Sequence, residues 1–123
     1  GTDHPSNAAY PALAYQFLLD GNSNFFVGTV EGFPEIDTIV RLAKEKNMKK
    51  IYLTPLMVVA GDHANNDMAG DEDDSWKTIL KSEGFEVEPI LKGLGEYPEI
   101  RALYVAHTQA AIDSATEEAE DEE

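Results

Sequence analysis

The 123-residue chain contains no cysteine. Disulfides, thiolate metal sites and thiol catalysis are therefore excluded. Basic residues are also scarce, since nine lysines and arginines stand against 24 aspartates and glutamates and give a formal net charge of −15. Such a charge argues against a nucleic-acid partner or an anionic membrane surface, because phosphate groups would repel it. No apolar run approaches the ~20 residues of a membrane-spanning helix.

The acidic residues are concentrated at the C-terminus, where six of them lie between residues 117 and 123. The length suits one compact domain with its own core. We predict that this domain covers residues 1–115, and that residues 116–123 form a disordered, solvated acidic tail. The alternative interpretation is that the acidic tail binds divalent cations weakly.

The chain opens on Gly1-Thr2-Asp3-His4-Pro5, which lacks an initiator methionine and has the character of a loop already under way. We therefore expect an excised or trimmed chain. No signal peptide is recognisable in the sequence. A cytoplasmic protein is expected, with a periplasmic one as the alternative, because any leader peptide would be absent from this chain.

Helical and strand patterns alternate along the sequence. Three short segments rich in β-branched and aromatic residues predict strands at Phe25 to Val30, Ile51 to Val59 and Phe85 to Ile90. The second is almost wholly apolar, which indicates a parallel sheet covered by helices on both faces. The third contains Pro89 and suits an edge. The predicted fold class is α/β, a three-layer domain with a mainly parallel sheet whose first strand would lie before Gly1.

Four helices are predicted around these strands. The last begins at Pro98 and carries an apolar stripe, which we expect to be buried against the domain. His107 falls on this stripe and is interpreted as a packed histidine, with a domain interface as the alternative. The predicted helices cover residues 8–19, residues 34–47, a segment carrying Trp76 and Leu80 that stops at Gly84, and the last helix, whose stripe is Ile100, Leu103, Tyr104, His107 and Ala111.

Two potential metal ligands directly follow predicted strands. Glu31 comes after the first strand and His63 after the second. In an open parallel sheet, ligands bind beyond the carboxyl ends of the strands, so both side chains would face one cleft if the strands are neighbours. A carboxylate with an imidazole suits a borderline ion such as Co²⁺, Fe²⁺, Ni²⁺ or Zn²⁺. The alternatives are that Glu31 caps the next helix and that His63 bonds a nearby carbonyl.

The loop around His63 is rich in polar side chains, and such loops carry function more often than packing. Either Asp62 or Asp67 could orient His63 from behind. His4 lies in the opening loop and is interpreted as an exposed histidine near a frayed end, although the same sheet edge could place it near the site.

Gly93 and Gly95 flank Leu94 just before the last helix. The segment lacks the third glycine of a dinucleotide-binding loop. Its backbone N–H groups could hold an anionic group such as a substrate carboxylate. The other interpretation is a simple tight turn.

Residues 55–70, which include Gly61-Asp62-His63-Ala64, closely resemble a long block of the anaerobic sirohydrochlorin cobaltochelatases, members of the class II chelatases. Shorter segments resemble further blocks of the same family, and the likeness extends to about residue 115. These segments are residues 1–5, 30–35, 73–77, 93–96 and 98–101.

The resemblance implies the C-terminal half of an enzyme with two similar α/β halves and the tetrapyrrole between them. It implies ATP-independent insertion of Co²⁺ into sirohydrochlorin, on the anaerobic route to cobalamin. Co²⁺ would be a substrate, with Fe²⁺ or Ni²⁺ as other possible ions, and no cofactor would be required. Glu31 and His63 would be the catalytic and metal-binding residues, together with a histidine that stands immediately before the position of Gly1 and is absent from this sequence.

Because that histidine and the N-terminal half are absent, we expect little activity from this chain alone. A non-catalytic module that binds a metal, a tetrapyrrole or haem is the alternative function. The expected partners are the tetrapyrrole, and either the missing half or a second copy that rebuilds the cleft.

Overall fold

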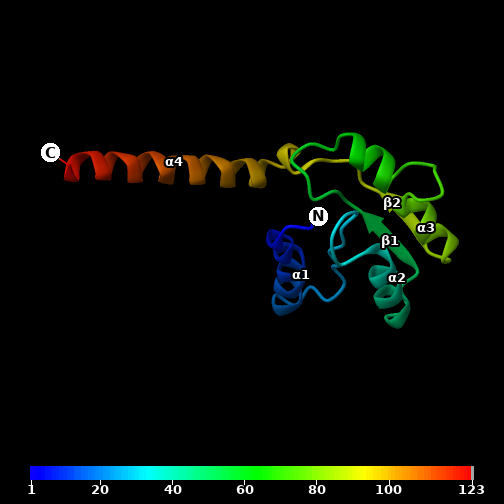
Figure 1. Cartoon of the computed structure of the whole chain (residues 1–123). Helices are drawn as coiled ribbons and strands as arrows, with labels where there is room; N and C mark the ends of the chain where they lie inside the picture. The colour runs from blue at the N-terminus through cyan, green and yellow to red at the C-terminus, as the bar shows by residue number, and fades with distance from the viewer. Residues whose placement is uncertain (123) are drawn as a thin grey trace.

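The computed structural model describes residues 1–122 and confirms an α/β fold with a parallel sheet (Figure 1). The sheet and two short helices form a body, from which the last helix projects alone. In chain order the elements are η1 (Pro5–Ala8), α1 (Ala9–Leu19), α2 (Ile36–Glu45), β1 (Lys50–Leu53), η2 (His63–Met68), α3 (Trp76–Ser82), β2 (Glu86–Pro89), η3 (Leu94–Glu96) and α4 (Pro98–Asp121).

The sheet of the described residues has two strands rather than the three predicted. β1 and β2 run parallel, with Lys50 opposite Glu86 and Leu53 opposite Pro89. Lys50 also bridges Glu86 and Glu88 on the neighbouring strand, at 3.7 and 2.8 Å. The second predicted strand was too long, because β1 ends at Leu53. Pro55 follows two residues later, and a proline cannot donate a hydrogen bond to a strand ladder.

The prediction of a strand from Phe25 to Val30 is wrong for the structure as described, since this segment pairs with no other strand. The Thr29 N–H donates to the carbonyl of Pro34 at 2.7 Å. This bond closes a local loop from residue 29 to residue 34 instead of joining a second strand. Phe25 and Val30 are more than half exposed. A β-branched, aromatic sequence fits a strand only where a neighbour supplies the other half of the hydrogen bonds.

A small core fills the space between the sheet, α2 and α3. Leu80 on α3 is completely buried, and Phe85 enters the core directly after Gly84, whose φ of 96° lets the chain turn into β2. Ser75 caps α3, because its Oγ accepts the Thr78 N–H at 3.2 Å and donates to the Gly70 carbonyl at 2.7 Å. The buried cluster consists of Ala43, Leu53, Ala64, Met68, Leu80, Phe85 and Val87.

α4 contacts the rest of the described chain only near its start, and none of its residues is buried (Figure 1). The prediction of a packed apolar face on this helix is therefore wrong for the described chain. Leu103 and Tyr104 are about half exposed, at 53% and 54%, and His107 and Ala111 are exposed. The reason is that no neighbouring element lies against the stripe in residues 1–122.

The acidic residues at the C-terminus continue α4 as helix through Glu117, Glu118 and Glu120 to Asp121. Glu123, the last residue of the predicted acidic tail, lies outside the described residues. The division into a domain of residues 1–115 and a disordered tail stays a prediction. Among the helices described here, none combines the length and apolar character that crossing a membrane requires.

Candidate functional site

Glu31 is held on an exposed loop between Thr29 and Pro34. Thr29 is buried, and both its N–H and its hydroxyl donate to the Pro34 carbonyl, at 2.7 and 3.1 Å, so the loop is closed at its base. The alternative of a helix cap is ruled out for Glu31, because the N-cap of α2 is Glu35. Gly1 lies directly against this loop, since a Cβ added to it would stand 1.6 Å from the Glu31 carbonyl oxygen.

His63 begins the π-helical segment η2. Ala64 and Met68 of this segment are buried in the core and fix its orientation, while the His63 side chain stays 77% exposed. Its Nδ1 lies 2.5 Å from Oδ2 of Asp67, one helical turn later. Short π-helical segments often occur at functional sites, because the wider turn re-aims a side chain.

The His63 imidazole stands in a negative environment. Its pKa is raised above the ordinary value, first by the hydrogen bond and charge of Asp67 and then by the charges of Glu31 and Asp62; slight burial opposes this rise. The contribution of Glu31 to this rise is smaller than that of Asp67. Because Nδ1 faces a carboxylate, Nε2 is the nitrogen that remains directed away from Asp67.

The structure separates the two aspartates that the sequence left as alternatives. Asp67 bonds His63, whereas Asp62 occupies the N-cap of η2 without a capping side-chain bond. Asn65 has a role that sequence reasoning missed. Its Nδ2 donates to the carbonyls of Ala60 and Gly61, at 3.1 and 2.9 Å, and ties η2 to the loop that precedes it. An asparagine inside a polar loop is a common signal for such a local bond.

His4 performs a structural task in its own loop. Its Nδ1 accepts the Ser6 N–H at 3.1 Å and thereby caps the short helix η1. It lines an open hollow of about 370 Å³ that includes Asn7 and Phe33 but neither Glu31 nor His63. The structure therefore does not bring His4 together with the two candidate ligands.

The backbone of the Gly93–Gly95 segment is already hydrogen-bonded. The Gly93 N–H donates to Glu96 Oε2 at 2.7 Å, the Leu94 N–H to the Met57 carbonyl, and the Gly95 N–H to the Val58 carbonyl. These bonds agree with the interpretation of a tight turn, because the donors that could hold a substrate carboxylate are occupied within the chain. The glycines instead allow close packing, since a Cβ at Gly93 would lie 2.4 Å from the Val58 oxygen.

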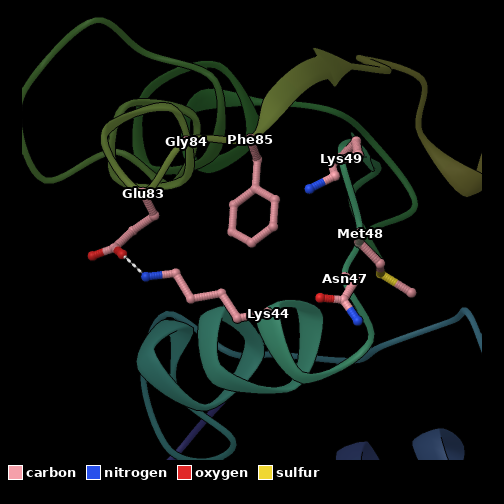
Figure 2. Close-up of a pocket in the computed structure, with 7 residues that line it drawn as sticks. All are labelled: Lys44, Asn47, Met48, Lys49, Glu83, Gly84 and Phe85. Carbon is pink, nitrogen blue, oxygen red and sulfur yellow. Dashed lines mark hydrogen bonds and ion pairs between the residues drawn. The ribbon is translucent and has the colours of Figure 1, made fainter.

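A second hollow, of about 170 Å³, lies where β1 and β2 begin (Figure 2). Lys44 of α2 and Glu83 at the end of α3 form an ion pair beside it, and the Phe85 side chain points toward α2. Because ligands of parallel sheets bind at the opposite, carboxyl ends of the strands, we do not assign the candidate site to this hollow.

As predicted ligands, Glu31 and His63 would supply two donors. Within residues 1–122, no group of three or more histidine, cysteine, aspartate or glutamate side chains converges on a point that could hold a metal ion. Divalent transition ions commonly take four or more donors, so this pair alone would not complete a coordination shell.

Comparison with known proteins gives consistent results. A family model described as cobalt chelatase (CbiK) matches residues 1–113. The chain is 43% identical over 119 residues to a sirohydrochlorin cobaltochelatase of Salmonella typhimurium, which covers 97% of this chain and 45% of that protein. It is 34% identical over 112 residues to the sirohydrochlorin cobaltochelatase CbiKC of Nitratidesulfovibrio vulgaris, covering 91% and 39% respectively. The chain thus spans less than half the length of both relatives.

Proposed function

Because the chain belongs to the cobalt chelatase family, we propose that it supplies the half of an enzyme that carries Glu31 and His63 and inserts Co²⁺ into sirohydrochlorin. The observation that carries this proposal is the family match over residues 1–113, and the exposed His63 imidazole bonded to Asp67 supports it locally. Co²⁺ and the tetrapyrrole are both substrates, with Fe²⁺ or Ni²⁺ as alternative ions, and the reaction uses neither ATP nor a resident cofactor. Its expected location is the cytoplasm.

His63 is the residue proposed to accept a pyrrole proton and to bind the metal ion during insertion. Insertion requires that the pyrrole protons leave while the ion is held near the ring plane. Only the neutral imidazole can accept a proton or bind a metal, and Nε2 is the available nitrogen because Nδ1 is bonded to Asp67. Asp67 fixes the ring orientation and raises the basicity of the imidazole, as carboxylates behind metal-binding histidines do.

Glu31 is proposed as the second ligand. Its carboxylate would partly neutralise the charge of Co²⁺ as the ion leaves water. The histidine that the family resemblance expects immediately before Gly1 would stand beside Glu31, because Gly1 already lies against the Glu31 carbonyl. These three side chains would then approach the ion from one side of the ring.

The partner proposed for this chain is a second α/β unit. This unit is either a domain that corresponds to the part of the relatives not covered by this chain, or another copy of the chain. α1 and α4 have no buried residue and carry large apolar side chains, so both helices offer surface for such a unit. These exposed side chains are Tyr15, Leu18, Leu19, Leu103, Tyr104, Val105 and Ile112.

The test joins this chain to the part of the Salmonella typhimurium relative that it does not cover, and follows Co²⁺ insertion by the absorbance of the tetrapyrrole. His63→Ala should abolish insertion. Asn24→Ala, which removes an exposed side chain from a turn, should leave the rate unchanged and serves as the control. Retained turnover in the His63→Ala protein would sink the assignment.

A non-catalytic binding module is the second candidate, favoured by the two-donor site and by the net charge of −15, which opposes an acidic tetrapyrrole. The 123-residue chain alone distinguishes the two functions. If it binds Co²⁺ or the tetrapyrrole without insertion, and the joined protein is equally inactive, the binding module is correct. Insertion by the joined protein supports the enzyme.

A further inference from the structure

Asn7 is one of the few buried polar side chains in the described chain, at 3% exposure. Its two ends bind different segments. Oδ1 accepts the Thr2 N–H at 3.1 Å, and Nδ2 donates to the Phe33 carbonyl at 2.7 Å. The Asn7 amide therefore connects the opening segment of the chain to the loop that carries Glu31, across 26 residues of sequence in the case of Phe33.

The neighbouring backbone is fitted closely around this amide. Gly32 adopts a φ of 99°, which favours glycine, and a Cβ there would lie 2.3 Å from Asn7 Oδ1. On the other side of the loop, Gly1 packs against the Glu31 carbonyl. A shift of Asn7 would therefore disturb Gly32 and Phe33, which directly follow Glu31.

Glu31 itself is exposed, and its side chain makes no hydrogen bond to another described residue. Its position consequently depends on the backbone of its loop. Thr29 closes that loop onto Pro34, but this bond joins the loop only to itself. Asn7 is the side chain that fixes the loop relative to the opening segment.

We propose that Asn7 is a positioning residue for the Co²⁺ site, because its amide holds the Glu31 loop against the Gly1–Thr2 segment. This inference rests on the proposed function, since it takes Glu31 as a ligand. A carboxylate on a fixed loop is already placed for the ion, whereas a loose loop must be ordered when the ion binds. Loss of such supporting bonds commonly costs about 10- to 100-fold in metal affinity.

The test uses the whole 123-residue chain, Co²⁺ alone as the probe, and the paramagnetic shift and broadening of backbone amide resonances. In the unaltered chain, Co²⁺ should perturb residues 30–33 and residues 62–67 over the same concentration range. Asn7→Asp and Asn7→Leu keep the side-chain size but cannot donate to Phe33. Asn24→Asp, at an exposed turn, is the control for added charge.

Both Asn7 variants should need about tenfold more Co²⁺ to perturb residues 30–33 and residues 62–67, because one ion contacts both segments. The Asn24→Asp chain should respond like the unaltered one. A general loss of structure would instead shift the amide resonances of core residues such as Leu80 before any Co²⁺ is added. Equal responses of residues 30–33 in all four chains would overturn the inference and leave the proposed function standing. If Co²⁺ perturbs neither segment in the unaltered chain, it is the proposed pairing of Glu31 with His63 that fails.

A measurement without substitution guards against variants that do not fold. The side-chain amide protons of Asn7 should exchange slowly with solvent in the unaltered chain, because one of them is buried in the bond to Phe33. Those of exposed Asn24 provide the reference rate. Equal exchange at Asn7 and Asn24 would show that the amide bridge does not form, and the inference would be wrong.

Discussion

The body around β1 and β2 differs from α4 in what stabilises its helices. α3 has seven residues, yet it is capped by a buried serine and presents Leu80 to the core. α4 has 24 residues and buries none of them. Isolated helices shorter than about 12–15 residues are marginal in water, and most helical stability in proteins comes from packing of an apolar face. The comparison teaches that local sequence is sufficient to specify α4 as a helix, while its tertiary stability depends on a covering surface.

The same difference bears on the site. η2 belongs to the body, since Ala64 and Met68 anchor it in the core, and it aims His63 outward. The Glu31 loop has no such anchor and is held by hydrogen bonds from Thr29 and Asn7. One candidate ligand is thus positioned by packing and the other by a polar bridge.

The largest effect is expected from Leu80→Ala. Leu80 is completely buried at the centre of the core, so its truncation should lower the free energy of unfolding by about 3 kcal/mol. Urea unfolding followed by tryptophan fluorescence would measure this loss. Leu103→Ala removes the same atoms from α4, where 53% of the side chain is exposed, and should change the stability of the chain by less than about 0.5 kcal/mol. Similar losses at the two positions would mean that α4 packs in solution.

A smaller effect is expected from Ser75→Ala. The substitution removes the cap of α3 and leaves the Gly70 carbonyl without its donor. Loss of a serine cap typically costs about 1 kcal/mol, and burial of the serine places the value in the upper part of the range, near 2 kcal/mol. The same urea experiment measures it. Ser82→Ala, which removes an exposed hydroxyl on the same helix, is the control, and equal losses would contradict a capping role for Ser75.

The four helices and the parallel order of two strands could be predicted because they depend on local signals. Spacing of apolar residues, Ser75 before α3 and Pro98 at the start of α4 all act within one or two helical turns. The segment from Phe25 to Val30 has strand composition but no neighbour to pair with in the described chain. Pairing is a non-local property, so composition could not settle it.

The candidate site was predictable to a similar extent. Glu31 and His63 were predicted as ligands because each follows a segment of strand composition. In the structure residues 25–30 are unpaired and β1 ends at Leu53, so neither residue directly follows a strand, and their role as ligands stays a prediction. Asp67 rather than Asp62 could be chosen only from the structure, because the choice depends on the π-helical turn of η2. The hydrogen bond from Asn7 to Phe33 joins residues far apart in sequence, and no local sequence pattern predicts it. The sequence left two interpretations open for the Gly93–Gly95 donors, because two of their partners lie on residues 57 and 58.

A third prediction sharpens the comparison through helix propensity. Ala110→Gly in α4 and Arg41→Gly in α2 each place glycine at an exposed mid-helix position, at a local cost of about 1 kcal/mol. In α2 this cost should appear as lower stability of the body, because α2 packs on the core through Ala43. In α4 it should reduce the helical signal in circular dichroism and leave the urea midpoint unchanged. A lower midpoint for Ala110→Gly would show that α4 folds cooperatively with the body.

The smallest effect concerns His63, whose side chain is exposed at the surface of the body. Asp67→Asn should lower the pKa of His63 toward its ordinary value, measured by titrating the imidazole C–H resonances. Because the folded pKa is raised, the stabilisation by Asp67 is complete below the unfolded value of 6.5 and is lost as pH rises through the folded one. The variant should therefore be slightly less stable in acid and unchanged at alkaline pH. Asp62→Asn, which removes a weaker and unbonded charge, should shift the pKa less; an equal shift would contradict the bond between His63 and Asp67.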